Sequence, residues 1–157
     1  MNTKLIVTDK KHVIRHMNEL YQHDISVYDE NFRDLNDAGL FEYLYLDHYW
    51  TEKGRYPYLF TIDDKYVGFA LIRKRSATEY AAGAHEIAEF FILRKYRKQG
   101  MGSHFAKALL EKHKGSWFFG TQMKNFGAQA FWRKVIAESA TSAVDENENM
   151  EWSFSNL

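Results

Sequence analysis

The chain has 157 residues, 45% of them hydrophobic, which suits a single domain, residues 1–157, with a sizeable core. Its 21 basic and 21 acidic residues cancel, so no overall charge draws it to nucleic acid or to a membrane surface. The absence of cysteine excludes a disulfide framework, thiolate zinc sites and a cysteine nucleophile. No apolar run has the length of a signal-peptide core or a membrane span, so we expect a cytoplasmic protein.

The first half of the chain alternates between helical and extended patterns. Apolar residues at three- and four-residue intervals after Asp9 predict an amphipathic helix, and Gly68, inside a later apolar run, indicates a bulge or a close backbone approach. In order, we expect a strand at residues 5–8, a helix ending near residue 24, a loop with a helical turn or two at 25–39, a helix from 40 to before 54, and a hairpin with strands at 59–62 and 66–74.

The second half predicts one strand-helix-strand crossover followed by a helix and a hairpin. We expect a strand at residues 85–93, a helix ending near 114, a strand at 117–121, a helix at 125–138, and strands at 141–144 and 150–154 around an acidic turn. Antiparallel hairpins combined with a single crossover imply an α/β (α+β) fold. Its mixed, mostly antiparallel sheet would be a single layer of about six to seven strands flanked by helices.

The turn between the strand at 85–93 and the next helix has the composition of an anion-binding site. It reads Arg97-Lys98-Gln99-Gly100-Met101-Gly102-Ser103. Glycine lets the backbone approach a ligand closely, and the first turn of a helix offers N–H groups without partners. The spacing fits neither a P-loop nor a dinucleotide-binding turn, because the former needs its glycines five apart and the latter needs a third glycine.

Two motifs resemble the GNAT superfamily of N-acetyltransferases. Arg97-x-x-Gly100-x-Gly102 resembles the family's pyrophosphate-binding motif, and Asn125-x-x-Ala128-x-x-Phe131-Trp132 resembles its later pantetheine-side segment. The resemblance is clear over residues 58–135. The alternative is an ordinary strand-turn-helix whose glycines serve only the geometry of the turn.

The resemblance implies a GNAT-like fold, acetyl-CoA as co-substrate, and no metal. It places the diphosphate on the backbone N–H groups of Lys98, Gln99, Gly100, Met101, Gly102 and Ser103, with Arg97 and Lys98 supplying positive charge. The pantetheine arm would meet the backbone of Ile92 and the side-chain amide of Asn125, and Trp132 would line its channel.

Two glutamates are candidates for the base that an amine acceptor needs. Glu86 is the first, because family members often carry a base or a base-bound water at about that place on the strand, and Glu89 is the second. Strict alternation along the strand predicts that they face opposite sides of the sheet, with His85 on the side of Glu89, so that only one glutamate enters a given site. The alternative for either is a carboxylate paired with Arg or Lys.

Trp132 departs from the family pattern. Many members have a tyrosine there whose hydroxyl returns a proton to the leaving thiolate, and an indole N–H does not do so in a useful pH range. Proton return then comes from water or another tyrosine, or it is unneeded because a thiol of pKa about 8.5 leaves readily as thiolate. A third possibility is a non-catalytic acyl-CoA sensor or interaction module.

The acceptor is expected to be a small amine or an exposed amino group on a peptide. Between Asp24 and Glu52 there are eight acidic residues and one basic residue, Arg33, and aromatic residues are dense in the following stretch. Carboxylates and aromatic faces suit a cationic amine. The alternative is that the acids face water and the aromatics form core. No nucleic-acid or membrane partner is expected, and a homodimer through the closing hairpin is possible.

Overall fold

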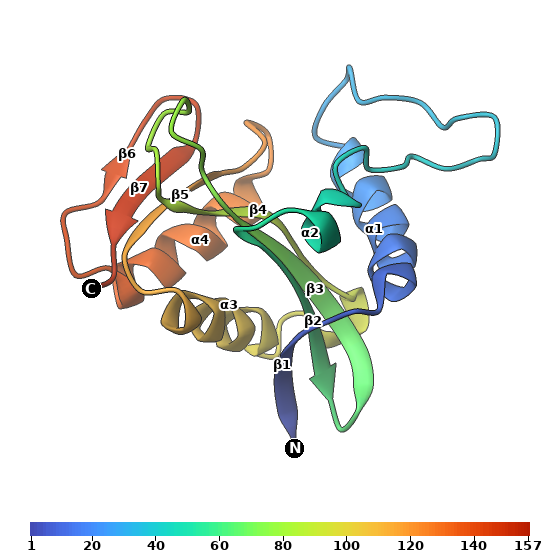
Figure 1. Ribbon diagram of the computed structural model, residues 1–157, viewed down its shortest axis with the longest axis horizontal. Helices are drawn as coiled ribbons and strands as arrows, with labels where there is room; N and C mark the ends of the chain where they lie inside the picture. Colours follow the sequence, from blue (N-terminus) through green and yellow to red (C-terminus); the bar gives the residue numbers. More distant parts are fainter.

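A single twisted sheet of seven strands runs through the protein in the order β1-β2-β3-β4-β5-β7-β6 (Figure 1). The computed structural model describes all residues, Met1–Leu157. Neighbouring strands are antiparallel except β4 and β5, which are parallel. The mixed, mostly antiparallel fold class predicted above is therefore confirmed. The elements in chain order are β1 Thr3–Val7, α1 Lys11–Ser26, α2 His48–Thr51, β2 Arg55–Ile62, β3 Lys65–Lys74, β4 His85–Ile92, a 3-10 turn Arg94–Tyr96, α3 Met101–Lys112, β5 Ser116–Gly120, α4 Phe126–Ser139, β6 Asp145–Glu146 and β7 Glu151–Ser155.

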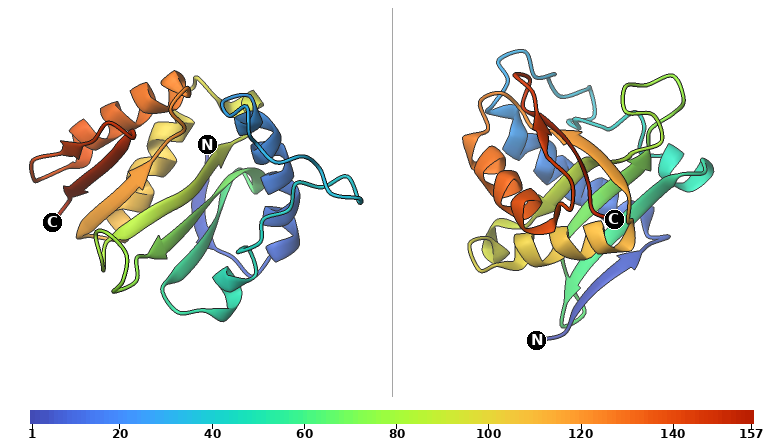
Figure 2. Two further views of the ribbon diagram at one scale, coloured as in Figure 1. Left: turned by 90° about the horizontal axis from the view of Figure 1, so that it is seen from above. Right: turned by 90° about the vertical axis from the view of Figure 1, so that its left-hand side faces the viewer.

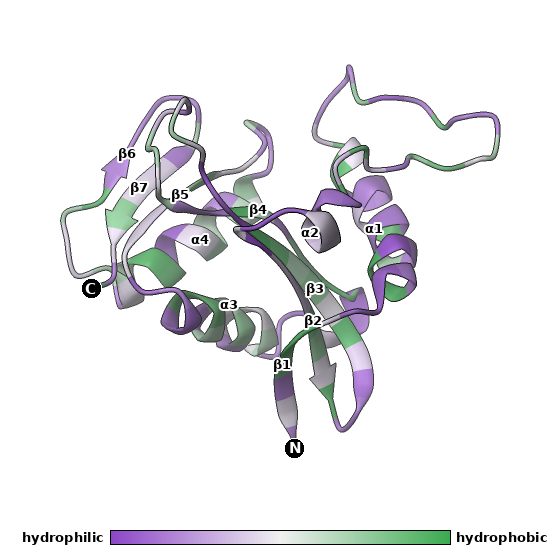
Figure 3. Ribbon diagram, viewed as in Figure 1, coloured by the Kyte–Doolittle hydropathy of each residue, from purple (hydrophilic) through white to green (hydrophobic).

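Helices cover both faces of the sheet, so the protein has two hydrophobic cores. The larger core joins one face to α3 and α4, with Phe105 and Trp132 among its members. The smaller joins the other face to α1 and α2 and includes Ile14 and Tyr49. Figure 2 shows the two pairs of helices on opposite sides of the sheet. Hydrophobic residues are concentrated on the central strands, whereas α1 is mostly hydrophilic away from the sheet (Figure 3).

Strands β4 and β5 pair only at one end. His85 lies opposite Trp117 and Glu86 opposite Phe118, and beyond these two positions the strands have no further paired residues. The sheet therefore opens between β4 and β5, and the backbone of β4 from Ile87 onward is left without a neighbouring strand on that side. Backbone groups freed in this way are available to a ligand lying in the opening.

A bulge in β4 overturns the prediction that Glu86 and Glu89 face opposite sides. Leu71 of β3 pairs with Glu89 and Ile72 pairs with Ile87, so Ala88 is an extra residue with no partner. One extra residue reverses the alternation of side chains, and both glutamates line the same cavity on the α1 side.

The companion prediction for His85 is wrong for the same reason. Its ring lies on the opposite face from Glu89, 4.7 Å from the ring of His113 and 5.5 Å from that of Trp117.

The predicted second helix is mostly absent, because only His48–Thr51 is helical. Before it, the chain is fixed by polar contacts that use backbone groups a helix would need. The carboxylate of Glu19 accepts hydrogen bonds from the N–H groups of Phe41 and Glu42, at 2.7 and 3.0 Å. Glu42 has a positive φ of 56°, which interrupts a right-handed helix.

Two further predictions concern strands. The closing hairpin exists, but its first strand is only Asp145–Glu146, inside the segment expected to be the turn. The interpretation of Gly68 is confirmed. A Cβ added there would lie 2.1 Å from the carbonyl oxygen of Phe91, so the backbones of β3 and β4 approach too closely for any side chain.

Candidate active site

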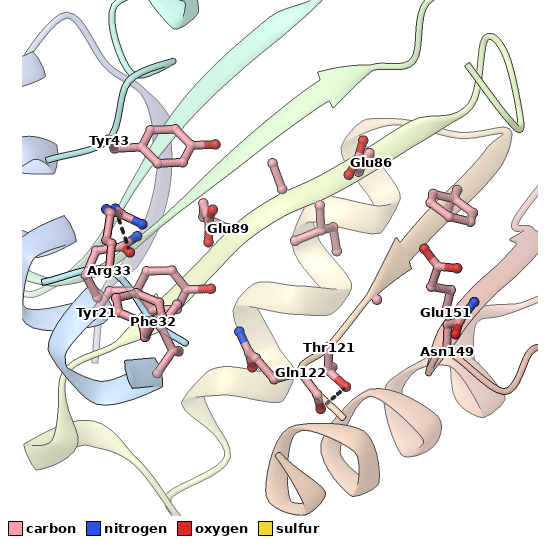
Figure 4. A pocket seen from close by; sticks show the side chains of 16 residues that line it. Tyr21, Phe32, Arg33, Tyr43, Glu86, Glu89, Thr121, Gln122, Asn149 and Glu151 are labelled. Atoms are coloured by element: carbon pink, nitrogen blue, oxygen red, sulfur yellow. Dashed lines mark hydrogen bonds between the residues drawn. The ribbon is translucent and has the colours of Figure 1, made fainter. Parts of the chain in front are cut away.

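A cavity of about 590 Å³ lies between the opening in the sheet, the second half of α1 and the segment that follows α1. Strand β4 contributes residues 86–89 to its wall, β5 contributes Phe118 and Gly120, and Gln122 follows β5. Tyr21, Arg33 and Tyr43 come from the amino-terminal part of the chain. Figure 4 shows these side chains converging from elements that are far apart in the sequence.

Glu89 is the most perturbed carboxyl group of the cavity. Burial raises the pKa of Glu89 from 4.5 to about 7, although the hydroxyls of Tyr21 and Tyr43 and the positive charge of Arg33 favour its ionised form. The side chain lies between the two tyrosines (Figure 4). A carboxyl group with a pKa near neutrality can accept a proton from a substrate and release it again, which is the requirement for a general base.

Glu86 occupies a different electrostatic environment on the same wall. Its Oε2 atom lies 2.6 Å from Nη2 of Arg73 and 2.8 Å from Nη1 of Arg75. These side chains are largely buried, with exposed fractions of 18%, 23% and 11% for Glu86, Arg73 and Arg75. Glu86 is therefore paired with two arginines, the arrangement that the sequence left as an alternative.

The turn after β4 presents a row of free backbone donors. None of the N–H groups from Lys98 to Ser103 donates a hydrogen bond to the backbone or to a side chain, and α3 begins at Met101. Lys98 and Gly100 have positive φ angles of 58° and 80°, which bend the turn. The N–H groups and the positive end of the α3 dipole together suit an anion such as a diphosphate.

The two glycines of the turn serve different purposes. Gly100 has the left-handed conformation that side chains disfavour, although the space around it is open. Gly102 has no such strain, but a Cβ there would lie 3.2 Å from the ring of Phe131 in α4. Its missing side chain lets α3 lie close to α4.

Arg97 is already engaged within the protein. Its Nε atom donates to the carbonyl oxygen of Ile92 at 2.7 Å, and its Nη2 atom lies 2.5 Å from a carboxylate oxygen of Asp24. The other Asp24 oxygen accepts from Arg94, also at 2.5 Å. The C-terminal end of α1 is thus tied to the turn. The backbone of Ile92 was expected to meet pantetheine, and one lone pair of its carbonyl oxygen is already used by Arg97.

Asn125 and Trp132 lie at the start of α4 and within it. The Asn125 side chain caps the helix by accepting from the N–H of Ala128 at 3.1 Å, and its amide donates to Gln122 at 3.0 Å. Trp132 is 6% exposed and is packed against the rings of Phe90 and Phe119. Both residues therefore have structural roles, whatever they contribute to a ligand.

Sequence reasoning missed Tyr21, Tyr43 and Arg33 as cavity residues. The spacing of Tyr21 in α1 indicated only that it faces the sheet, and Tyr43 was one of many aromatics. None of the eight acidic residues between Asp24 and Glu52 lines the cavity, whereas the single basic residue, Arg33, does. The signal available in the sequence was that Arg33 is the single basic residue in a stretch with eight acidic residues.

None of the helices is both long and apolar enough to cross a membrane. Comparison of the sequence with curated proteins gives no significant match.

Comparison with solved structures gives whole-chain similarity at low identity. Acetyltransferase of the GNAT family from Staphylococcus aureus Mu50 aligns with a TM-score of 0.66 and 12% identity, over 99% of this chain and 100% of that one. Aminoglycoside acetyltransferase AAC(6')-Ib in complex with coenzyme A gives 0.66 and 15%, over 98% and 95%. Acetyltransferase from Thermus thermophilus gives 0.67 and 11%, over 99% and 96%. These likenesses establish the shared fold.

The sequence also matches a family profile directly. The profile described as acetyltransferase (GNAT) family covers residues 17–136. That range includes most of α1, the cavity wall on β4, the turn with its free N–H groups and most of α4. The chain therefore belongs to the GNAT family of acetyltransferases, as the two sequence motifs suggested.

Proposed function

We propose that the protein transfers an acetyl group from acetyl-CoA directly to an amine in a ternary complex. One observation carries the proposal: Glu89, a carboxyl group with its pKa raised to about 7, faces a cavity that opens into the gap between β4 and β5. The same strand leads to the turn with free N–H groups. A proton acceptor and a diphosphate site are thereby joined by one strand.

The chemistry requires a neutral amine. An alkyl ammonium with a pKa near 10.4 is neutral only about once in a few thousand molecules at pH 7. The ionised Glu89 carboxylate removes a proton from the bound ammonium, directly or through a water. The nitrogen lone pair then attacks the thioester carbonyl carbon, the N–C bond forms and the C–S bond breaks. The electron pair leaves on sulfur. The nitrogen also loses its second proton as the amide forms, and a water carries that proton to the thiolate.

Glu89 is the stronger candidate for this step, although the sequence alone favoured Glu86 as the base. Glu86 is already engaged in ion pairs with two arginines, at 2.6 and 2.8 Å. In this proposal Glu86 fixes negative charge beside the acceptor. The N–H groups from Lys98 to Ser103 bind the diphosphate, and Ile92, Asn125 and Trp132 lie along the pantetheine arm.

The test compares coenzyme A release by the parent and by Glu89→Gln with a panel of primary amines. We expect the variant to lose at least about a hundredfold in kcat/KM, the usual size of a general-base contribution, while calorimetry shows unchanged acetyl-CoA binding. In the parent, kcat/KM should rise with pH through about 7, because Glu89 must be ionised to act. Glu111→Gln, at an exposed residue paired with Lys114, is the matched control. An active Glu89→Gln variant would contradict the proposed role.

A second candidate function is a non-catalytic acyl-CoA sensor with the same fold. Trp132 favours it, because this indole stands where many members have a tyrosine and is buried against Phe90 and Phe119. This function predicts acetyl-CoA binding without acceptor-dependent release of coenzyme A. Turnover with any amine, abolished in Glu89→Gln, excludes it.

A further inference from the structure

Arg33 makes no ion pair with a carboxylate of the protein. Its Nε atom donates to the carbonyl oxygen of Phe41 at 3.0 Å, and its Nη2 atom donates to the Gln22 side chain at 3.0 Å and to the carbonyl oxygen of Glu42. All three acceptors are neutral. Since a guanidinium has five N–H donors, the two on Nη1 remain without a partner.

Several of the acidic residues between Asp24 and Glu52 pair with cations other than Arg33. Asp24 binds Arg94 and Arg97, Glu30 lies 2.9 Å from Lys124, and Asp47 pairs with Lys11. No ion pair includes Arg33, although eight of its neighbours between Asp24 and Glu52 are acidic. The guanidinium is therefore held by neutral hydrogen-bond acceptors and makes no ion pair.

This charge belongs to the wall of the cavity. Arg33 lies beside Tyr21, on the side of Glu89 away from Glu86 and Glu151 (Figure 4). It is near enough to Glu89 to favour the ionised form of that carboxyl group. The cavity thus holds a fixed cation and a proton acceptor on neighbouring parts of its surface.

Apart from Glu89, the carboxylates of the cavity do not compensate Arg33. Glu86 is already compensated by Arg73 and Arg75. Glu151 accepts a hydrogen bond from the Asn147 amide at 3.0 Å and lies at the other end of the cavity, with β7. A ligand that complements both ends has a negative group near Arg33 and an ammonium toward the glutamates.

We propose that the acceptor is an amine that also bears a carboxylate, as in a free amino acid or a short peptide, with the carboxylate bound by Arg33 and the amine facing Glu89. The proposal rests on the proposed function and names its substrate class. Proton and acetyl transfer proceed as described above, and the carboxylate is unchanged. A polyamine would place a second ammonium against Arg33 and is disfavoured by repulsion.

The test uses pairs of amines that differ only in the carboxylate: L-phenylalanine with phenethylamine, L-leucine with isoamylamine, and L-lysine with cadaverine. Each kcat/KM is calculated from the concentration of neutral amine, because the carboxylate also changes the amine pKa. We expect the parent to prefer the carboxylate-bearing member by about tenfold or more, the size of one charge-assisted hydrogen bond. Arg33→Met should bring the ratio close to one.

Controls separate recognition from damage to the fold. Arg133→Met removes an exposed arginine whose partner is Glu146, on β6, and should leave the ratio unchanged. Arg33→Lys keeps the charge and should retain part of the preference. Thermal melting and the KM for acetyl-CoA report whether loss of the Phe41 and Glu42 contacts disturbs the cavity. A parent that prefers the decarboxylated amines overturns the proposal, as does a ratio that Arg33→Met leaves intact. A raised KM for acetyl-CoA with an unchanged ratio would assign Arg33 to the coenzyme instead.

If no amine is acetylated, binding measurements still test recognition of the carboxylate separately from the transferase activity. The same pairs are titrated into protein saturated with coenzyme A. Selective binding of the carboxylate-bearing members, lost in Arg33→Met, would support the recognition while refuting the transferase activity. Equal or absent binding of both members would refute the recognition itself.

Discussion

Glu89→Gln is expected to change how stability depends on pH, independently of any substrate. Burial raises the pKa of Glu89 from 4.5 to about 7, so between these values the folded protein holds a proton that the unfolded chain has released. Because this pKa is raised on folding, the stabilisation is fully present below pH 4.5 and is lost as pH rises through 7. The parent therefore carries an energetic cost at about pH 8 that the neutral glutamine does not.

The size of this effect follows from the two pKa values. The interval from 4.5 to about 7, at about 1.4 kcal/mol per pH unit, corresponds to about 3 kcal/mol as an upper estimate. In a chain of this length, about 1 kcal/mol changes the melting temperature by about 2–4 °C. Relative to the parent, Glu89→Gln should gain roughly 6–12 °C on going from about pH 4.5 to about pH 8.

The assay is thermal or urea unfolding of both proteins at several pH values across this range. Glu86→Gln serves as the contrasting variant, since it removes one of the two carboxylates, Glu86 and Glu79, that pair with Arg73 and Arg75, and should lower stability at neutral pH. A difference between Glu89→Gln and the parent that stays constant across the range would show that the carboxyl group is not desolvated. Glu89 would then lack the raised pKa on which its role as a base depends.

Four other substitutions test the turn, the contact of His113 with the larger core, and helix α4. Replacing Gly100 by valine should strain the left-handed turn, and replacing Gly102 by valine should push against Phe131. Calorimetry should show weaker acetyl-CoA binding by both variants. Tight binding by the double variant would refute the diphosphate site. Burial, reinforced by a second imidazole, lowers the pKa of His113 to about 4, so the unfolded chain alone gains this proton as pH falls from 6.5 to 4. The parent should therefore lose more stability than His113→Phe between about pH 7 and about pH 5 in urea titrations. Asn125→Ala removes the cap of α4 and should cost about 1 kcal/mol in unfolding free energy; an unchanged midpoint would assign Asn125 no capping role.

The elements carried by clear periodicity were predictable from sequence. The apolar runs around Phe60, Phe69 and Phe91 form central strands, and the inward spacing of Phe105 and Leu109 forms α3, because burial of these side chains decides both structures. The turn between β4 and α3 was equally readable, since its glycines and basic residues are close together in the chain. Such features depend on neighbours in sequence.

The features that were predicted wrongly depend on contacts between segments distant in the sequence. The helix expected from residue 40 is replaced by a loop that Glu19 and Arg33 hold through backbone groups of Phe41 and Glu42. No local pattern reveals that a carboxylate 22 residues away takes these N–H groups. The choice between Glu86 and Glu89 likewise depended on a bulge, whose position is set by the pairing of β4 with β3.

That bulge makes the chemistry of the cavity depend on how β4 pairs with β3 as well as on which residues β4 contains. Because Ala88 has no partner on β3, its deletion would restore regular alternation and leave Glu86 and Glu89 on the same face. If Ala88 were instead paired with Ile72, without a bulge, every residue before it would exchange faces. His85 would then point into the cavity, and the Glu86 carboxylate would turn toward α3, away from Arg73 and Arg75. Gain or loss of a bulge in this strand is accordingly a route by which related chains can acquire different sets of catalytic groups.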